Sequence, residues 1–280
     1  MDMTIYIIIL LLMVLCLVLL HHYKNKQKKI LQTQGLANIT YLKSLIGAVQ
    51  TYRGLSSAWL NGDQSKKAML LTFEQQANSD IKHLQQYMLS NQGGHWDSFV
   101  DHWGRVNQPG NTNDAENTFK QHTQMIANLI YLLEDEAEHK HLNAMSLKQL
   151  RHIGLVWREL IRATETIGQS RAIGVGVATK KQCSDLDKVR LSFLQQKMQK
   201  IINDVLPKLG SLESEKEQHK LLLTAAISTI LCLMEAIESK LIEADKITIS
   251  QKQYFTLASN SIKSLDDIFK HQIEQIKQVI

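Results

Sequence analysis

The sequence predicts an all-α protein: an N-terminal transmembrane helix followed by two tandem antiparallel four-helix bundles. The 280 residues include only two prolines and thirteen glycines, so the chain has few of the turn residues that a sheet needs. Long segments of Leu, Ile, Lys, Gln, Glu and Ala carry apolar residues every three or four positions, which is the period of an α-helix. An uncharged apolar run stands at the start of the chain.

The first element is this apolar run, residues 3–20, which is about as long as a helix that crosses a bilayer core. A cleaved signal peptide is the alternative, but Asp2 stands where a basic residue is usual, and no small-residue cleavage site follows the run. By the positive-inside rule, the lysines within residues 24–29 predict that everything after them is cytoplasmic. We therefore expect residues 1–29 to anchor the chain as a single-pass protein of the inner (cytoplasmic) membrane.

Four helices are expected in the first half of the remaining chain. They cover residues 38–60, 66–89, 96–106 and 114–140. The segments between them are rich in Gly, Asn and Pro, which favour turns: residues 61–63, 90–94 and 107–113. Asp114 is the expected N-cap of the fourth helix, since its carboxylate can accept hydrogen bonds from the first turn.

A joint at residues 142–146 leads to four more helices. They cover residues 147–178, 184–205, 211–243 and 250–280. Ser146 and Ser184 are the expected N-caps of the first two. The third contains the apolar run 221–236, and we expect this run to be buried in a bundle and not in a membrane, because two threonines, a serine and a glutamate interrupt it.

Two stretches about 120 positions apart, residues 50–58 and 168–176, share one arrangement: an arginine at the end of an apolar stripe, among small residues. Arg53 follows Ile46 and Val49 at helical spacing, so its side chain is expected on the inward face. Arg171 follows Thr164 and Ile167 in the same way. The sequence therefore predicts two inward-facing arginines.

A guanidinium among apolar side chains is unfavourable unless it is paired, and the partner is either a carboxylate from another helix or a bound anion. Small residues leave room beside the two arginines: Gly54, Ser56, Gly168 and Gly174. Hydroxyl and amide groups add hydrogen-bond donors: Gln50, Ser56, Ser57 and Gln169. Room, donors and positive charge together favour a pocket for a small oxyanion, which arginine holds with two parallel hydrogen bonds.

Residues 52–56 (Tyr-Arg-Gly-Leu-Ser) and 168–174 (Gly-Gln-Ser-Arg-Ala-Ile-Gly) resemble the nitrate- and nitrite-sensing (NIT) domain of bacterial signalling proteins. Residues 249–258 are similar to the last helix of that family. The resemblance covers about residues 35–272, leaving 273–280 as a helical extension. It implies two four-helix bundles, at about 35–141 and 146–272, that bind nitrate or nitrite between helices through arginines and signal to an output domain.

The chain departs from the family pattern at two arginines and at its end. The best-known pattern has two adjacent arginines in the first motif, where Tyr52 precedes Arg53 here, and a later arginine that has no counterpart after Arg190. Arg53 and Arg171 carry over as anion ligands. Weaker candidates for the same site are Ser56, Ser57 and Gln169. No output domain follows the sensor, so the signal is expected to pass to a separate protein or along the anchor.

Other function classes find little support in the sequence. The net charge of +5 is mild, and no basic stripe with interleaved aromatics predicts nucleic-acid binding. No glycine-rich phosphate loop and no nucleophile, histidine and acid set predicts an enzyme or a cofactor. Asp135 and His139 stand four positions apart, but a solvated helix end explains them better than a metal site. The three cysteines lack a regular spacing, which fits a reducing compartment.

The sequence thus predicts a membrane-anchored receptor module for nitrate or nitrite that signals to a separate partner and is free to form a homodimer. The alternative is a membrane-tethered helical interaction protein that binds no small molecule. An acid within bonding distance of each inward arginine would favour the alternative.

Overall fold

The computed structural model describes residues 3–88, 94–107 and 114–280, and the described residues are helical without a β-strand. The all-α prediction is therefore confirmed. The helices are α1 (Met3–Leu60), α2 (Lys67–Met88), α3 (His95–Val106), α4 (Ala115–His139), α5 (Ile153–Leu155), α6 (Ile161–Lys180), α7 (Asp185–Lys200), α8 (Lys216–Ile237) and α9 (Gln251–Val279). Most of the turns predicted at residues 90–94 and 107–113 lie outside the described residues.

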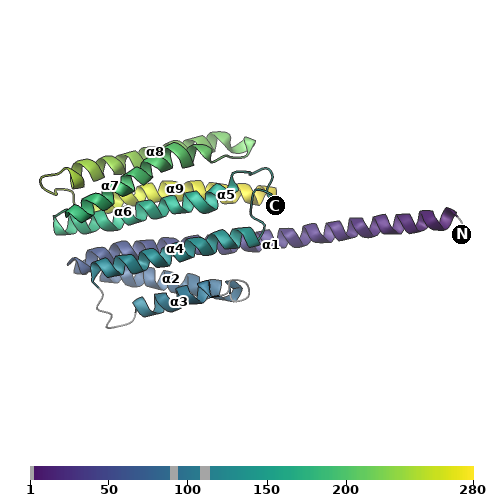
Figure 1. Ribbon diagram of the computed structural model, residues 1–280, viewed down its shortest axis with the longest axis horizontal. Helices are drawn as coiled ribbons and strands as arrows, with labels where there is room; N and C mark the ends of the chain where they lie inside the picture. Colours follow the sequence, from purple (N-terminus) through teal and green to yellow (C-terminus); the bar gives the residue numbers. More distant parts are fainter. Residues whose placement is uncertain (1–2, 89–93, 108–113) are drawn as a thin grey trace.

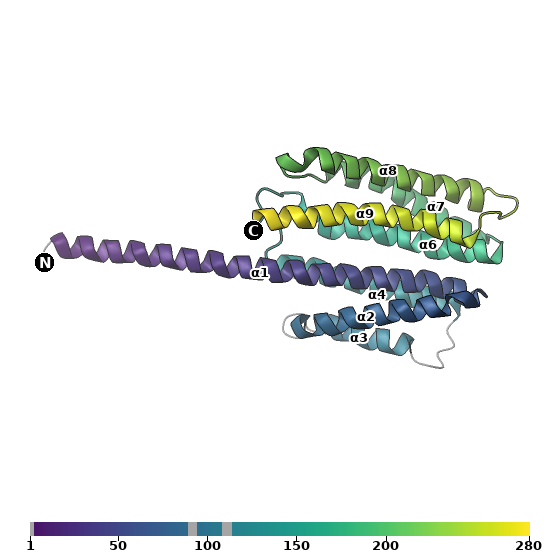
Figure 2. The same ribbon diagram turned by 180° about the vertical axis from the view of Figure 1, so that it is seen from behind.

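All of these helices except the three-residue α5 form two groups of four that lie side by side (Figures 1 and 2). The first bundle consists of α1 to α4, and the second bundle consists of α6 to α9. The main contact between the two bundles is that of α1 with α6, to which α4 adds. Side chains that lie between α1 and α6 are therefore part of the packing interface between the two bundles.

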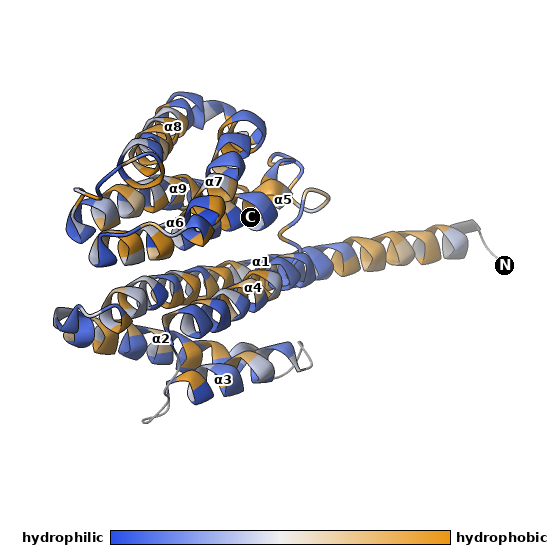
Figure 3. Ribbon diagram, turned by 60° about the vertical axis from the view of Figure 1, so that its left-hand side comes forward, coloured by the Kyte–Doolittle hydropathy of each residue, from blue (hydrophilic) through white to orange (hydrophobic). Residues whose placement is uncertain are grey.

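The expected anchor and the expected first helix of the bundle are one element. A separate start at residue 38 is wrong, because α1 runs without a break over 58 residues and ends before Gly62, which adopts a φ of +107°. The apolar part of α1 protrudes from the bundles (Figure 3), and its side chains from Ile9 to Leu20 are exposed. By length and apolar composition this part of the helix is a candidate membrane span.

The joint between the bundles differs from the prediction. Ser146 does not cap a helix; residues 144–152 are mostly turns, and the helical run that contains α6 begins at Ile153. The side chain of Asn143 accepts the hydrogen bond from the Ser146 N–H at 3.1 Å, and Trp157 donates to a backbone carbonyl of the joint at 2.7 Å. These bonds close the turns where a helix was expected.

Two predicted N-caps are confirmed. The Asp114 carboxylate accepts a hydrogen bond from the third residue of α4. Ser184 forms a capping box with Asp187 at the start of α7, in which each side chain bonds the other's backbone N–H.

The expectation that residues 221–236 are buried is wrong for one face of α8. This helix lies at the outer edge of the second bundle (Figure 1), and only 28% of its most apolar window is buried. Ala226, Ile230 and Leu233 face the bundle, whereas Leu221 and Leu231 are exposed. With its flanking turns the run Glu213–Ile242 is also long and apolar enough to count as a candidate span.

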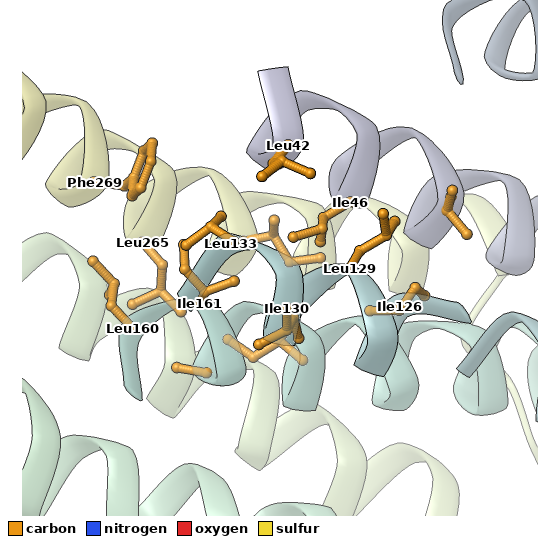
Figure 4. Close-up of a cluster of buried hydrophobic side chains, with 14 of the residues drawn as sticks. Leu42, Ile46, Ile126, Leu129, Ile130, Leu133, Leu160, Ile161, Leu265 and Phe269 are labelled. Atoms are coloured by element: carbon orange, nitrogen blue, oxygen red, sulfur yellow. The ribbon is translucent and has the colours of Figure 1, made fainter. Parts of the chain in front are cut away.

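The two bundles share one apolar core (Figure 4). Leu42 and Ile46 of α1 meet Leu129 of α4 where the bundles join, and side chains from α9 complete the cluster. Burying each such side chain contributes about 1.5–3 kcal/mol. The last residues of α9 belong to this core, since Ile276 is fully buried, so residues 273–280 pack against the bundle.

Candidate anion site

The two arginine motifs come together where α1 crosses α6, and each helix places a glycine opposite the arginine of the other. A Cβ on Gly168 would lie 3.0 Å from Nη2 of Arg53, and a Cβ on Gly54 would lie 3.8 Å from Nε of Arg171. The room predicted at these two glycines is therefore present. Gly174 makes room for a different side chain, because a Cβ there would lie 2.2 Å from the ring of Tyr254.

Arg53 is 1% exposed, as its inward position predicted. Its Nη1 donates to Oε1 of Glu165 at 2.6 Å and its Nη2 donates to Oε2 at 3.1 Å, so the guanidinium holds this carboxylate with two parallel hydrogen bonds. Nη1 also donates to the hydroxyl of Thr123 at 3.0 Å. The expectation that Arg53 lacks an acidic partner is wrong.

Glu165 is the residue that sequence reasoning missed. Its side chain is only 10% exposed. A signal was present, because Glu165 follows Ile161 by four positions and precedes Gly168 by three, which places it on the buried stripe of α6.

The Glu165 carboxylate accepts four hydrogen bonds. Besides the two from Arg53, Oε2 accepts from Nε2 of Gln50 at 3.0 Å and Oε1 accepts from Nε2 of Gln169 at 2.9 Å. Gln169, which the sequence placed among the anion ligands, thus donates to the acid that occupies Arg53. N–H donors of Arg53, Gln50 and Gln169 thus surround the planar Glu165 carboxylate and its two charged oxygens.

Arg171 is 5% exposed and forms no ion pair with any described residue. Its Nη1 donates to the hydroxyl of Ser259 at 3.1 Å, its Nη2 donates to the hydroxyl of Thr51 at 3.3 Å, and its guanidinium stands 5.0 Å from the ring centre of Phe255. Burial, followed by the nearby charge of Arg53, lowers the pKa of Arg171 to about 10. The predicted inward position is confirmed, and the charges of Glu165 and Asp266 partly offset the effect of burial without forming an ion pair with Arg171.

Several buried polar atoms around the two arginines have no hydrogen-bond partner among the described residues. They are Nε of Arg53, Nε of Arg171, Oε1 of Gln50 and Nε2 of His122. Buried polar groups are normally satisfied, so a group of unsatisfied atoms beside two guanidinium groups indicates a place where water or a small polar ligand binds.

The two serines of the first motif lie on different sides of α1. Ser57 donates to the backbone carbonyl of Ala172 at 3.1 Å, so it joins α1 to α6. Ser56 instead lines a cavity of about 90 Å³ on the side of the first bundle, together with Tyr52 and His122. The structure thus brings Ser57 next to the α6 motif and turns Ser56 away from it.

Tyr52 precedes Arg53 in the first motif. Its ring lies 5.4 Å from that of Trp103 and 5.3 Å from that of His122, inside the first bundle. Burial raises its pKa to about 12. This position faces the first bundle and not the crossing with α6, where Arg53 and Arg171 lie.

Comparisons with known proteins concern the family and the fold of the chain. A family model described as nitrate and nitrite sensing matches residues 44–277, which include both arginine motifs. A solved structure described as that of the NasR transcription antiterminator is similar to the chain, with a TM-score of 0.66 and 14% identity over 95% of this chain and 74% of that one. That likeness supports the fold. No curated protein matches the chain significantly. The resemblance predicted from the two motifs is confirmed, and the chain belongs to the nitrate- and nitrite-sensing family.

Proposed function

We propose that this chain is a membrane-anchored sensor, without enzymatic activity, that binds nitrate or nitrite between α1 and α6 and signals to a separate protein through a change in helix packing. The protruding part of α1 spans the inner membrane. The lysines within residues 24–29 then keep the bundles in the cytoplasm by the positive-inside rule.

The observation that carries this proposal is the state of Arg171. A buried cation normally has an acid beside it, because desolvation of an unpaired charge is unfavourable. Arg171 has two hydroxyl partners, an unpartnered Nε and no ion pair among the described residues. A small anion would supply the missing negative charge, and membership of the family indicates which anions are candidates.

Arg171 and Arg53 are the proposed anion ligands, one from each bundle. Ser57 and Gln169 stand beside them at the crossing, whereas Ser56 is a weaker candidate because it lines the cavity in the first bundle. An anion held by both bundles favours one packing over another only to the extent that it binds one of them more tightly. Since α1 is also the membrane helix, a change at Arg53 is transmitted directly into the anchor and the surface next to it.

Titration calorimetry on the full-length chain in detergent tests the proposal. We expect saturable heat with nitrate or nitrite, little with chloride, and none with nitrate in Arg171→Met. Arg158→Met is the matched control, because Arg158 is exposed on the helical run that leads into α6. The pairing of Arg53 with Glu165 favours the alternative, an interaction protein without a ligand, and the absence of saturable heat with every anion would establish that alternative.

A further inference from the structure

We infer that Glu165 is an internal competitor of the sensed anion: in the anion-free protein its carboxylate occupies the position on Arg53 that nitrate or nitrite takes on binding. This inference rests on the proposed function and adds a regulatory residue to the same site. It explains why one of the two arginines is paired within the chain.

The first argument is chemical similarity. A carboxylate, nitrite and nitrate all present two oxygens on a planar centre, with one negative charge shared between them. Arg53 meets the Glu165 oxygens at 2.6 and 3.1 Å in the paired geometry that guanidinium groups use for all such anions. The other donors, from Gln50 and Gln169, are neutral amides that also suit any planar oxyanion.

The second argument is the local balance of charge. Arg53, Arg171 and Lys43 are the cations of this region, and they face two carboxylates, those of Glu165 and Asp266. Asp266 is held by Lys43 at 2.6 Å, and Glu165 is held by Arg53. One positive charge is left over, which matches one monovalent anion. With that anion bound, the site has charge balance whichever arginine holds Glu165.

The third argument concerns what the exchange changes. Glu165 belongs to the second bundle, and its partners Gln50 and Arg53 belong to the first. Its displacement breaks the hydrogen bonds that these three residues form between the bundles. The bond from Ser57 to Ala172 stays in place, so α1 and α6 can shift relative to each other without separating. Exchange of Glu165 for an anion therefore converts binding into a change in packing.

Glu165→Gln in the full-length chain tests the inference, because the amide keeps the shape of the side chain and removes its charge. Calorimetry with nitrate is expected to give a Kd at least tenfold lower than that of the wild type. Glu165→Asp retains the charge but shortens the side chain, so the carboxylate reaches the guanidinium less well and an intermediate Kd is expected. Glu134→Gln is the control, since it removes a more exposed ion pair between α4 and α6, with Arg162 at 2.7 Å, and should leave the Kd unchanged.

A distance measurement adds a readout that does not depend on affinity. Cys232 is exposed on α8, and Lys82→Cys adds a second exposed thiol on α2, so spin labels at these positions span the two bundles once Cys16 and Cys183 are replaced by serine. We expect nitrate to shift the distance distribution in the otherwise wild-type chain. The Glu165→Gln chain is expected to show the shifted distribution without nitrate.

The outcomes separate the two proposals. If the wild type binds nitrate and Glu165→Gln binds it with equal or lower affinity, Glu165 is no competitor, and the proposed function remains. If no variant and no wild-type sample binds nitrate or nitrite, both proposals fail. Circular dichroism and thermal unfolding establish that each variant is folded. If Glu165→Gln is unfolded without nitrate, the Kd of Glu165→Asp decides whether Glu165 competes with the anion.

Discussion

Arg53 and Arg171 come from the same motif, lie in the same interface and are almost equally buried, yet their surroundings differ. Arg53 holds a carboxylate with two hydrogen bonds, whereas Arg171 donates to two hydroxyls, stands over an aromatic ring and feels the charges of Glu165 and Asp266 without an ion pair to either. The motif determines where an arginine points, and residues far away in the sequence determine whether it is satisfied. Arg53 has an acidic partner within the chain, whereas Arg171 has no ion-pair partner among the described residues.

This difference has an energetic consequence. Removing one member of a buried ion pair leaves the other charge uncompensated, which typically costs about 3–5 kcal/mol. Removing a buried charge that has no ionic partner instead relieves a desolvation penalty. Matched substitutions at Arg53 and Arg171 should therefore change the stability of the anion-free protein in opposite directions.

The largest effect is expected for Arg53→Met. This change leaves the buried Glu165 carboxylate with two amide donors and without its ion-pair partner, so the free energy of unfolding should fall by about 3–5 kcal/mol. Urea unfolding without nitrate measures it. Adding Glu165→Leu to the same chain should restore most of the loss. A decrease of less than about 1 kcal/mol for Arg53→Met would show that the pair does not matter for stability.

The next largest effect on stability is expected from protonation of His122, which lies close enough to Arg53 to feel its charge. Burial, to which the charge of Arg53 adds, lowers the pKa of this histidine to about 4. The unfolded state therefore takes up the proton first, and the contribution of His122 to stability should be constant above about pH 6.5 and fall towards pH 4 by about 1.4 kcal/mol per pH unit. Urea unfolding from pH 4 to 7 measures this, with His122→Gln as comparison. An equal pH dependence in both chains would contradict the account.

Arg171→Met should stabilise the anion-free protein by about 1–2 kcal/mol. The reason is that the pKa of Arg171 is lowered in the folded state, so at neutral pH the fold bears the desolvation of a charge that the unfolded chain leaves in water. The same variant should lose the increase in melting temperature that nitrate gives the wild type. Destabilisation by more than about 1 kcal/mol would mean that the hydroxyl and aromatic contacts already satisfy Arg171.

The smallest effect is expected at a third arginine between the bundles. Arg190 of α7 donates to both oxygens of Glu116 of α4, and this bond lowers the pKa of Glu116 to about 2. Both side chains are partly exposed, and exposed pairs contribute little. Arg190→Met should therefore reduce the free energy of unfolding by less than about 1 kcal/mol, measured in urea, and should leave nitrate binding unchanged. A larger loss would show that the bundles depend on this contact more than on the crossing of α1 and α6.

Most of the fold could be predicted from local patterns. The apolar period placed the helices, and side-chain caps such as Ser184 fixed where they begin. The prediction failed where two local signals compete, as at Ser146, whose N–H bonds to Asn143 in a turn. It also failed for α8, because a stripe pattern shows that one face is apolar but does not show how much of the helix its neighbours cover.

The sequence could predict where the site lies, but it could not predict which residues pair within it. Helical spacing placed both arginines inward, and Gly54 and Gly168 indicated that there is room beside them. The pairing of Arg53 with Glu165 joins residues 112 positions apart, and no local pattern specifies such a contact. Such a contact follows from how α1 and α6 cross, which is a property of the packed bundles.

The most direct test of anion binding at Arg171 is NMR of the arginine Nε–H groups during a nitrate titration. The chain has seven arginines, so single-site arginine variants can assign the spectrum. We expect the Arg171 signal to shift and saturate as nitrate is added, while that of the exposed Arg158 stays in place. An Arg171 signal that does not move at nitrate concentrations that raise the melting temperature of the protein would contradict the account.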